Sequence, residues 1–230
     1  MLKLLKHDLK DSYLEVVILS GIALAASFLV FAGYKLNISF IATIGQVGFV
    51  FGLSALQIIL LITIIKSFHT KLFTNCGYLT LTTPVSLDKI LISKILVSML
   101  WVFTAMVTTI GCVFIIFSAS SSFFISLFNS LVKSIINNPF ETFKGIVIGL
   151  AAVLFFLTTL IFILVLTNTG WMKKHKLLKG ILLYLAFAMI TSQVAFIFTS
   201  YVWYLSLFLV VSVIMYLLSR WLITTKLELE

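Results

Sequence analysis

The chain has 230 residues, of which 62% are hydrophobic and 10% charged, and its mean hydropathy is +1.23. A soluble domain is about 45–50% apolar and about 25% charged, so an ordinary soluble domain, a disordered chain and a disulfide scaffold are excluded. The two cysteines, Cys76 and Cys112, give no disulfide framework and no metal-ligand spacing. We therefore expect an all-α integral membrane protein. The net charge of +9 then reflects the lysines that flank apolar runs, and it does not indicate a nucleic-acid partner.

Six stretches are long and apolar enough to form spanning helices, which need about 20 residues each. They cover residues 16–33, 40–65, 95–117, 145–167, 180–199 and 202–223, and together they predict one transmembrane domain over 1–230. The sequence Ala23-Leu24-Ala25 resembles a signal-peptide cleavage site. Because the apolar run continues to Phe31, we expect the first span to be retained.

Lys and Arg residues in the short loops predict the orientation. If the six spans alternate, thirteen of the sixteen Lys and Arg residues lie on one side and three (Lys35, Lys133 and Lys144) on the other. This asymmetry predicts that both termini are cytoplasmic and that the protein is a multi-pass protein of a bacterial cytoplasmic membrane.

Two segments are predicted to be helical without spanning. In residues 1–13, Leu2, Leu5, Leu9 and Tyr13 recur at helical spacing, which indicates an amphipathic helix in the inner interface, serving either as an anchor or as a lever. Residues 118–144 lie outside and carry Phe124, Leu127 and Leu131 at helical spacing up to Asn138-Pro139. An interfacial or re-entrant helix fits this outer segment best, and it is either a passive loop or an outer gate.

The cytoplasmic segment 66–94 is longer than a simple return of the chain requires. It exposes apolar side chains such as Phe68, Leu72, Phe73 and Tyr78, at a cost in free energy. Thr83-Pro84 fits the start of a helix that leads into the third span, with Ser86 or Thr83 as its cap. The segment is either a docking surface for a cytoplasmic partner or a loop that folds back under the bundle.

Sequence motifs for catalysis are absent. The chain has no G-x-x-x-x-G-K-[ST], no H-E-x-x-H and no G-x-S-x-G. We therefore expect no enzymatic activity, no catalytic residues, no metal and no cofactor in this chain. The spans hold almost no ionisable residues away from their ends, which argues against an ion-coupled carrier and against a channel with a charged ring.

The spans also contain uncharged polar residues and glycines. Gln46 and Gln57 share one face of the second span, and Gln193 lies within the fifth. These amides are candidates either for hydrogen bonds between helices, which we favour, or for a translocation path. Gly45, Gly48 and Gly52 form a stripe for close helix packing, within the chain or across a dimer.

The cytoplasmic segment resembles the permease subunits of ABC-2 type exporters, most closely the small six-span bacterial permeases that export lantibiotics and bacitracin. The family pattern there is a Phe, an apolar pair and a G-Y-L-T-x-T-x-P-V-S run. The matching residues are Phe68, Leu72, Phe73 and the run Gly77-Tyr78-Leu79-Thr80-Leu81-Thr82-Thr83-Pro84-Val85-Ser86. Cys76 and Thr83 depart from the pattern, at positions where acidic and apolar residues are common.

The resemblance implies a coupling helix that docks on a separate ABC ATP-binding subunit, which carries ATP and Mg²⁺. The implied docking residues are Phe68, Lys71, Leu72, Phe73, Tyr78, Leu79 and Pro84. It also implies a second permease subunit, identical or related, with which the chain forms the translocation path. The uncharged spans favour an amphipathic peptide, a lipid or a drug-like molecule as cargo. Alternatives are a non-transport immunity or sensor subunit and a stand-alone carrier.

Overall fold

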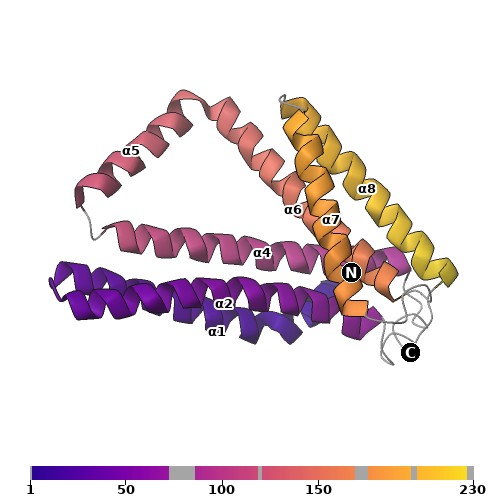
Figure 1. Cartoon of the computed structure of the whole chain (residues 1–230), viewed down its shortest axis with the longest axis horizontal. Helices are drawn as coiled ribbons and strands as arrows, with labels where there is room; N and C mark the ends of the chain where they lie inside the picture. Colours follow the sequence, from indigo (N-terminus) through magenta and orange to yellow (C-terminus); the bar gives the residue numbers. More distant parts are fainter. Residues whose placement is uncertain (1, 73–85, 119–120, 169–175, 198–200, 227–230) are drawn as a thin grey trace. The chain divides into compact units, whose positions relative to one another are not determined.

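A computed structural model describes residues 2–72, 86–118, 121–168, 176–197 and 201–226 (Figure 1). These residues are almost entirely helical and contain no strand, which confirms the all-α prediction. The helices are α1 (Leu2–Lys35), α2 (Ser39–Leu72), α4 (Leu87–Ser118), α5 (Ser121–Asn137), α6 (Pro139–Thr167), α7 (Lys176–Ile197) and α8 (Tyr201–Lys226).

Five stretches of the described helices are long and apolar enough to cross a bilayer: Leu5–Lys35, Ser39–His69, Leu87–Ser118, Pro139–Thr167 and Tyr201–Thr225. They correspond to five of the six predicted spans. Their number indicates a multi-pass membrane protein. The remaining one, the fifth predicted span over residues 180–199, coincides with α7, whose described apolar part, Lys179–Thr191, is shorter.

The chain divides into two compact units. One comprises Lys6–Ile64 and Leu100–Thr142, and the other comprises Met1–Leu5, Ile65–Met99 and Phe143–Glu230. We call them the hairpin unit and the three-helix unit, after α1–α2 in the first and α6–α8 in the second.

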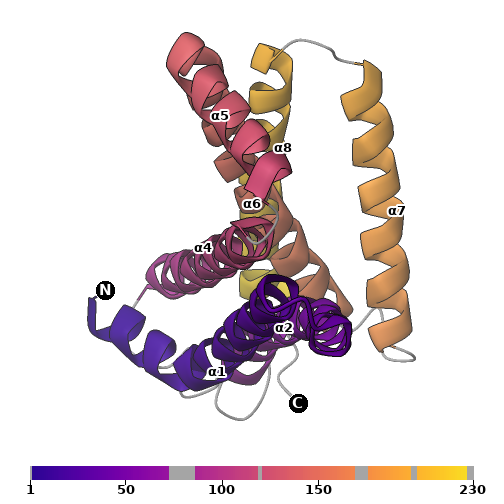
Figure 2. The ribbon, with the colours of Figure 1, turned by 90° about the vertical axis from the view of Figure 1, so that its left-hand side faces the viewer.

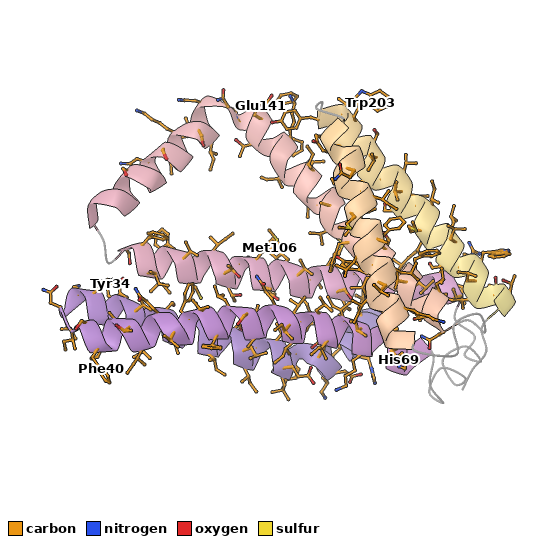
Figure 3. The ribbon with its side chains drawn as sticks, in the orientation of Figure 1. Tyr34, Phe40, His69, Met106, Glu141 and Trp203 are labelled. Atoms are coloured by element: carbon orange, nitrogen blue, oxygen red, sulfur yellow. The ribbon has the colours of Figure 1, made fainter. Side chains whose placement is uncertain are left out.

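The hairpin unit is built on the antiparallel pair α1 and α2, which lie side by side in both views (Figures 1 and 2). The turn between them begins with a C-terminal cap of α1. Asn37 adopts a left-handed backbone with φ of 55°, its N–H bonds to the Tyr34 carbonyl at 3.3 Å, and the Ile38 N–H bonds to the Gly33 carbonyl at 3.0 Å. This is the Schellman arrangement, in which a left-handed residue reverses the chain and satisfies the last carbonyls of the helix. Tyr34 and Phe40 accordingly lie at the same end of the hairpin (Figure 3).

Aromatic side chains hold the three-helix unit together. The Phe155 ring of α6 lies 6.3 Å from that of Phe187 on α7 and 5.4 Å from that of Phe208 on α8, measured between centroids. Phe156 meets Tyr184 of α7 edge to face at 6.0 Å. Such pairs contribute about 0.5–1.5 kcal/mol beyond the area they bury. Because α6 makes these pairs with both α7 and α8, it is the central helix of this unit.

The N-terminal segment differs from the prediction. The sequence predicts a separate helix over 1–13, whereas α1 runs without a break from Leu2 to Lys35. No Gly or Pro occurs before Gly21, so nothing stops the helix where its pattern changes from amphipathic to apolar. The segment between the third and fourth predicted spans is helical as predicted: α5 ends at Asn137, and Pro139 is the first residue of α6, where its missing N–H is not needed.

Candidate functional site

The segment that carries the family resemblance is described only at its two ends. Helix α2 ends at Leu72 and α4 begins at Leu87. Of the predicted docking residues, Phe73, Tyr78, Leu79 and Pro84 lie outside the described residues. Lys71 and Leu72 form the last turn of α2, and Phe68 stands one turn before them.

Phe68 is not part of an exposed surface, which corrects the expectation for this residue. Its side chain is only 1% exposed, and it is one of the largest fully buried side chains in the described chain. The ammonium of Lys94 lies 5.8 Å from the centroid of its ring. The Phe68 ring therefore packs inside the protein, because the last turns of α2 are helical and covered rather than looped out.

Lys94 itself is 2% exposed, although it carries an ammonium group. Its Nζ donates a hydrogen bond to the Ser67 carbonyl at 2.9 Å. A buried charge needs compensating groups, and the carbonyl dipole and the Phe68 ring face both provide them. The contact joins the end of α2 to the second turn of α4.

A second polar contact fixes the first turn of α4. The Tyr216 hydroxyl donates to Asp88 Oδ1 at 3.0 Å, and Arg220 Nη2 lies 3.2 Å from Asp88 Oδ2. Tyr216 and Arg220 are four residues apart and therefore project from one face of α8. The carboxylate also lies near the positive end of the α4 dipole, where negative charge is favourable. Asp88 thus connects α4 to α8.

Ser86 precedes α4 as its N-cap residue. Its carbonyl accepts hydrogen bonds from the N–H groups of Lys89 at 2.9 Å and Ile90 at 3.4 Å. Of the two caps that the sequence left open, Ser86 thus occupies the position, and Thr83 lies outside the described residues. Asp88 and Lys94 are six residues apart, or roughly 240° around a helix, so the first two turns of α4 are bonded to other helices on two different sides.

The glycine stripe of α2 is used within the chain. A Cβ on Gly45 would lie 2.7 Å from the backbone nitrogen of Val30, and one on Gly52 would lie 3.5 Å from the Cα of Ala23. A Cβ on Gly48 would lie 3.7 Å from the Cβ of Ala26. Of the two uses that the sequence left open for these glycines, the structure shows close packing of α2 on α1.

The three glutamines lie on exposed faces. Gln46 Nε2 donates a hydrogen bond to the Tyr34 hydroxyl, which links α2 to α1 near the turn. Gln57 is exposed on α2, and Gln193 is exposed on α7. Gln46 and Gln57 belong to the hairpin unit and Gln193 to the three-helix unit.

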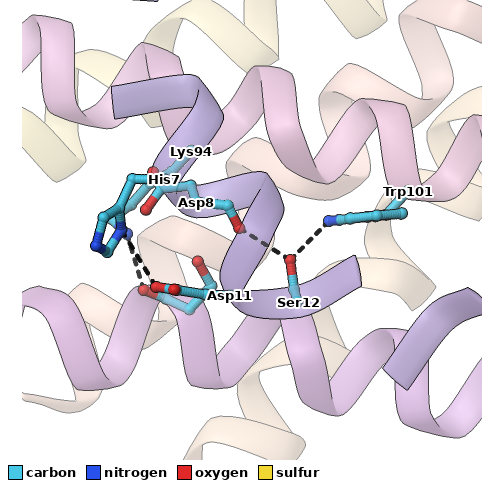
Figure 4. A network of polar contacts seen from close by, with 7 residues as sticks. His7, Asp8, Asp11, Ser12, Lys94 and Trp101 are labelled. Carbon is cyan, nitrogen blue, oxygen red and sulfur yellow. Dashed lines mark hydrogen bonds and ion pairs between the residues drawn. The ribbon is translucent and has the colours of Figure 1, made fainter. Parts of the chain in front are cut away.

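The start of α1 carries a small polar network (Figure 4). Trp101 Nε1 donates to Ser12 Oγ at 2.9 Å, and Ser12 Oγ donates to the Asp8 carbonyl at 3.0 Å. His7 Nδ1 lies 3.3 Å from Asp11 Oδ2, one helical turn further along α1. One side-chain ligand atom from each of His7, Asp8 and Asp11 lies within 4.8 Å of the others, but exposed acidic groups of this kind are common without a metal. The network attaches α1 to α4 within the hairpin unit.

Sequence reasoning missed the contacts of Asp88, Tyr216, Arg220 and Lys94. In the sequence, Lys94 and Arg220 counted only among the positive charges that predict the orientation of the spans. Asp88 counted only as part of the cytoplasmic segment 66–94. Two local signals were present: an acidic residue in the first turn of a predicted helix, and a Tyr and an Arg four residues apart on another helix. No spacing rule joins residues that are 128 positions apart in the chain.

Comparisons with known proteins give no relative. No family model, no curated protein and no solved structure matches the chain.

Proposed function

We propose that this chain is the membrane-spanning permease subunit of an ATP-driven exporter of the ABC-2 type. In this proposal it has six spans and cytoplasmic termini, it sits in a bacterial cytoplasmic membrane, and it pairs with a second permease subunit. A separate ATP-binding subunit supplies the energy. The cargo is an amphipathic peptide, a lipid or a drug-like molecule.

The observation that supports the proposal most is the bracing of α4 where it leaves the motif-bearing loop. A loop transmits force only if its ends are joined firmly to the helices that must move. Lys94 binds the Ser67 carbonyl of α2, and Asp88 binds Tyr216 of α8. A push on residues 73–85 would therefore act together on the end of α2, the start of α4 and helix α8, and rigid-body switching requires such a joint movement.

The apolar residues of the loop are the other half of the argument. Residues 73–85 include Phe73, Tyr78 and Leu79. Apolar and aromatic side chains that fill a groove of a partner are a common mode of docking. With α4 braced at its start, such docking would couple partner closure to the spans.

Co-purification tests the proposal. The tagged chain is expressed with its neighbouring genes, purified in mild detergent, and the bound proteins are identified. We expect an ATP-binding subunit that is retained by the Leu36→Asp variant and lost from the Leu79→Asp variant. Leu36 is a matched control, because it is 63% exposed in the turn between α1 and α2. Recovery of the chain alone, or equal binding by both variants, would contradict the proposal.

A further inference from the structure

The first turns of α1 separate their charged side chains into two arcs around the helix. One arc of roughly 100° carries a histidine and three acidic residues, namely His7, Asp8, Asp11 and Glu15. Lys6 and Lys10 are both exposed and share another arc, whose centre lies roughly 130° away. The start of α1 therefore has a basic side and a separate acidic side.

The acidic side is used within the hairpin unit. Glu15 Oε2 accepts a hydrogen bond from Thr63 Oγ1 of α2 at 3.0 Å, and Asp11 Oδ2 lies 3.3 Å from His7 Nδ1 (Figure 4). Asp8 is only 7% exposed. Neither of the two lysines makes a hydrogen bond or an ion pair with any residue that the structure describes. Their positive charge is therefore directed to the surroundings of the chain.

An aromatic and two aliphatic side chains continue the basic side along α1. Tyr13, Leu14 and Val17 are 42%, 55% and 53% exposed, and they lie within roughly 60° of the centre of the lysine arc. A Cβ on Gly21, further along the same line, would meet nothing within 4 Å. The side of α1 that packs on the α2 glycines is roughly opposite. This line of side chains is therefore uncovered by the described chain.

The order of these side chains matches the order of groups across one leaflet of a bilayer. Lys6, Lys10, Tyr13, Leu14 and Val17, which we call the graded stripe, extend over roughly 16 Å of the helix axis. Tyr side chains favour the membrane interface, lysines reach the headgroups, and aliphatic side chains favour hydrocarbon. A soluble anion would complement the lysines alone, and an apolar helix would complement the aliphatic side chains alone. A phospholipid with a negative headgroup complements the whole stripe.

We propose that the graded stripe binds anionic phospholipids of the cytoplasmic leaflet, with Lys6 and Lys10 at the phosphate groups and Leu14 and Val17 along the acyl chains. The inference rests on the proposed function only for the cytoplasmic orientation of the N-terminus, and it adds a partner that the transport proposal does not include. Because α1 runs without a break from Leu2 to Lys35, lipid bound at its start fixes the depth of the whole α1–α2 hairpin in the bilayer. Of the two roles left open for the N-terminal segment, this is the anchor.

Lipid binding by the purified full chain tests the inference. The chain is titrated in neutral detergent with phosphatidylglycerol or with phosphatidylcholine of the same acyl chains. Native mass spectrometry gives the apparent Kd of the first bound lipid. The test variant combines Lys6→Gln with Lys10→Gln. The matched control combines Lys35→Gln with Lys133→Gln, which removes the same charge from two exposed positions of the hairpin unit.

We expect the wild-type chain to bind phosphatidylglycerol roughly tenfold more tightly than phosphatidylcholine, because each lysine near an anionic surface strengthens binding roughly fivefold. This preference should fall as the ionic strength is raised. The test variant should lose it, and the control should keep it. Size-exclusion chromatography checks the fold of each variant. Should the double variant aggregate, Lys10→Gln alone should weaken phosphatidylglycerol binding roughly fivefold.

Three results would overturn the inference. Equal affinity of the wild-type chain for the two lipids would remove the role of the headgroup charge. Equal losses in the two double variants would assign the preference to net charge rather than to the graded stripe. Displacement of the lipid by glycerol 3-phosphate, which has a phosphate but no acyl chains, would assign the lysines to a soluble anion. The titration needs no ATP-binding subunit, so its failure is distinguishable from failure of the co-purification test.

Discussion

The Asp88 carboxylate and the Arg220 guanidinium lie 3.2 Å apart, and they join the first turn of α4 to the last turns of α8. Tyr216 completes the contact by donating its hydroxyl to the other carboxylate oxygen. Residues far apart in the chain thus meet at the start of α4, close in sequence to the segment that carries the family resemblance.

Removing the Tyr216 hydroxyl tests the contribution of this contact to stability. We expect Tyr216→Phe to lower the free energy of unfolding by about 1 kcal/mol, because the lost hydrogen bond is to a charged group but is partly exposed. Unfolding in mixed detergent micelles measures the change. Tyr204→Phe, on the same helix, is the control and is expected to have no measurable effect. Equal losses in the two variants would contradict the assignment of Tyr216 to Asp88.

The ion pair itself is expected to be weaker. The Asp88 and Arg220 side chains are 35% and 50% exposed, and pairs of this kind contribute about 0.2–1 kcal/mol. A double-mutant cycle with Asp88→Asn and Arg220→Gln should give a coupling energy of about 0.5 kcal/mol that falls as salt is raised. A coupling energy of zero at low salt would contradict the pair.

We expect substitution of Lys94 to lower the free energy of unfolding far more than substitution of Lys89. Lys94→Ala removes a buried hydrogen bond to a carbonyl and a cation–π contact, and should cost about 3 kcal/mol. Lys89→Ala, at an exposed position five residues earlier, should stay within about 0.5 kcal/mol of the wild type. The same unfolding measurement compares them, and equal values would show that the Lys94 contacts contribute nothing.

Close packing of α2 on α1 predicts opposite effects for two glycines. Gly45→Ala places a methyl group against the Val30 backbone, and overpacking of this kind costs about 1–3 kcal/mol. Gly21→Ala meets nothing within 4 Å, so the higher helix propensity of alanine should stabilise by up to about 1 kcal/mol. Thermal unfolding in detergent measures both. Equal tolerance of the two substitutions would contradict the close approach at Gly45.

The sequence predicted the all-α class and the places of the long apolar helices, because length and hydropathy alone determine them. It also predicted the break between α5 and α6, because Pro139 can begin a helix but not continue one. It placed a boundary near Tyr13 that the structure lacks, because a change of pattern is not a stop signal.

The contacts at the end of α2 and at the start of α4 could not be predicted in the same way. Phe68 reads as an exposed aromatic beside charged residues, and only the fold shows that Lys94 covers it. Asp88 finds its partners on α8 through the packing of whole helices, and no local spacing determines that packing.

The hydrolysis of ATP by the reconstituted complex tests the central claim most directly. The ATP-binding subunit is assayed in nanodiscs alone, with the wild-type chain, and with the Asp88→Ala variant. We expect that the wild-type chain changes the rate of hydrolysis several-fold, and that Asp88→Ala weakens this effect while the complex still forms. An identical rate with and without the chain would contradict the claim that this membrane protein is driven by an ATPase.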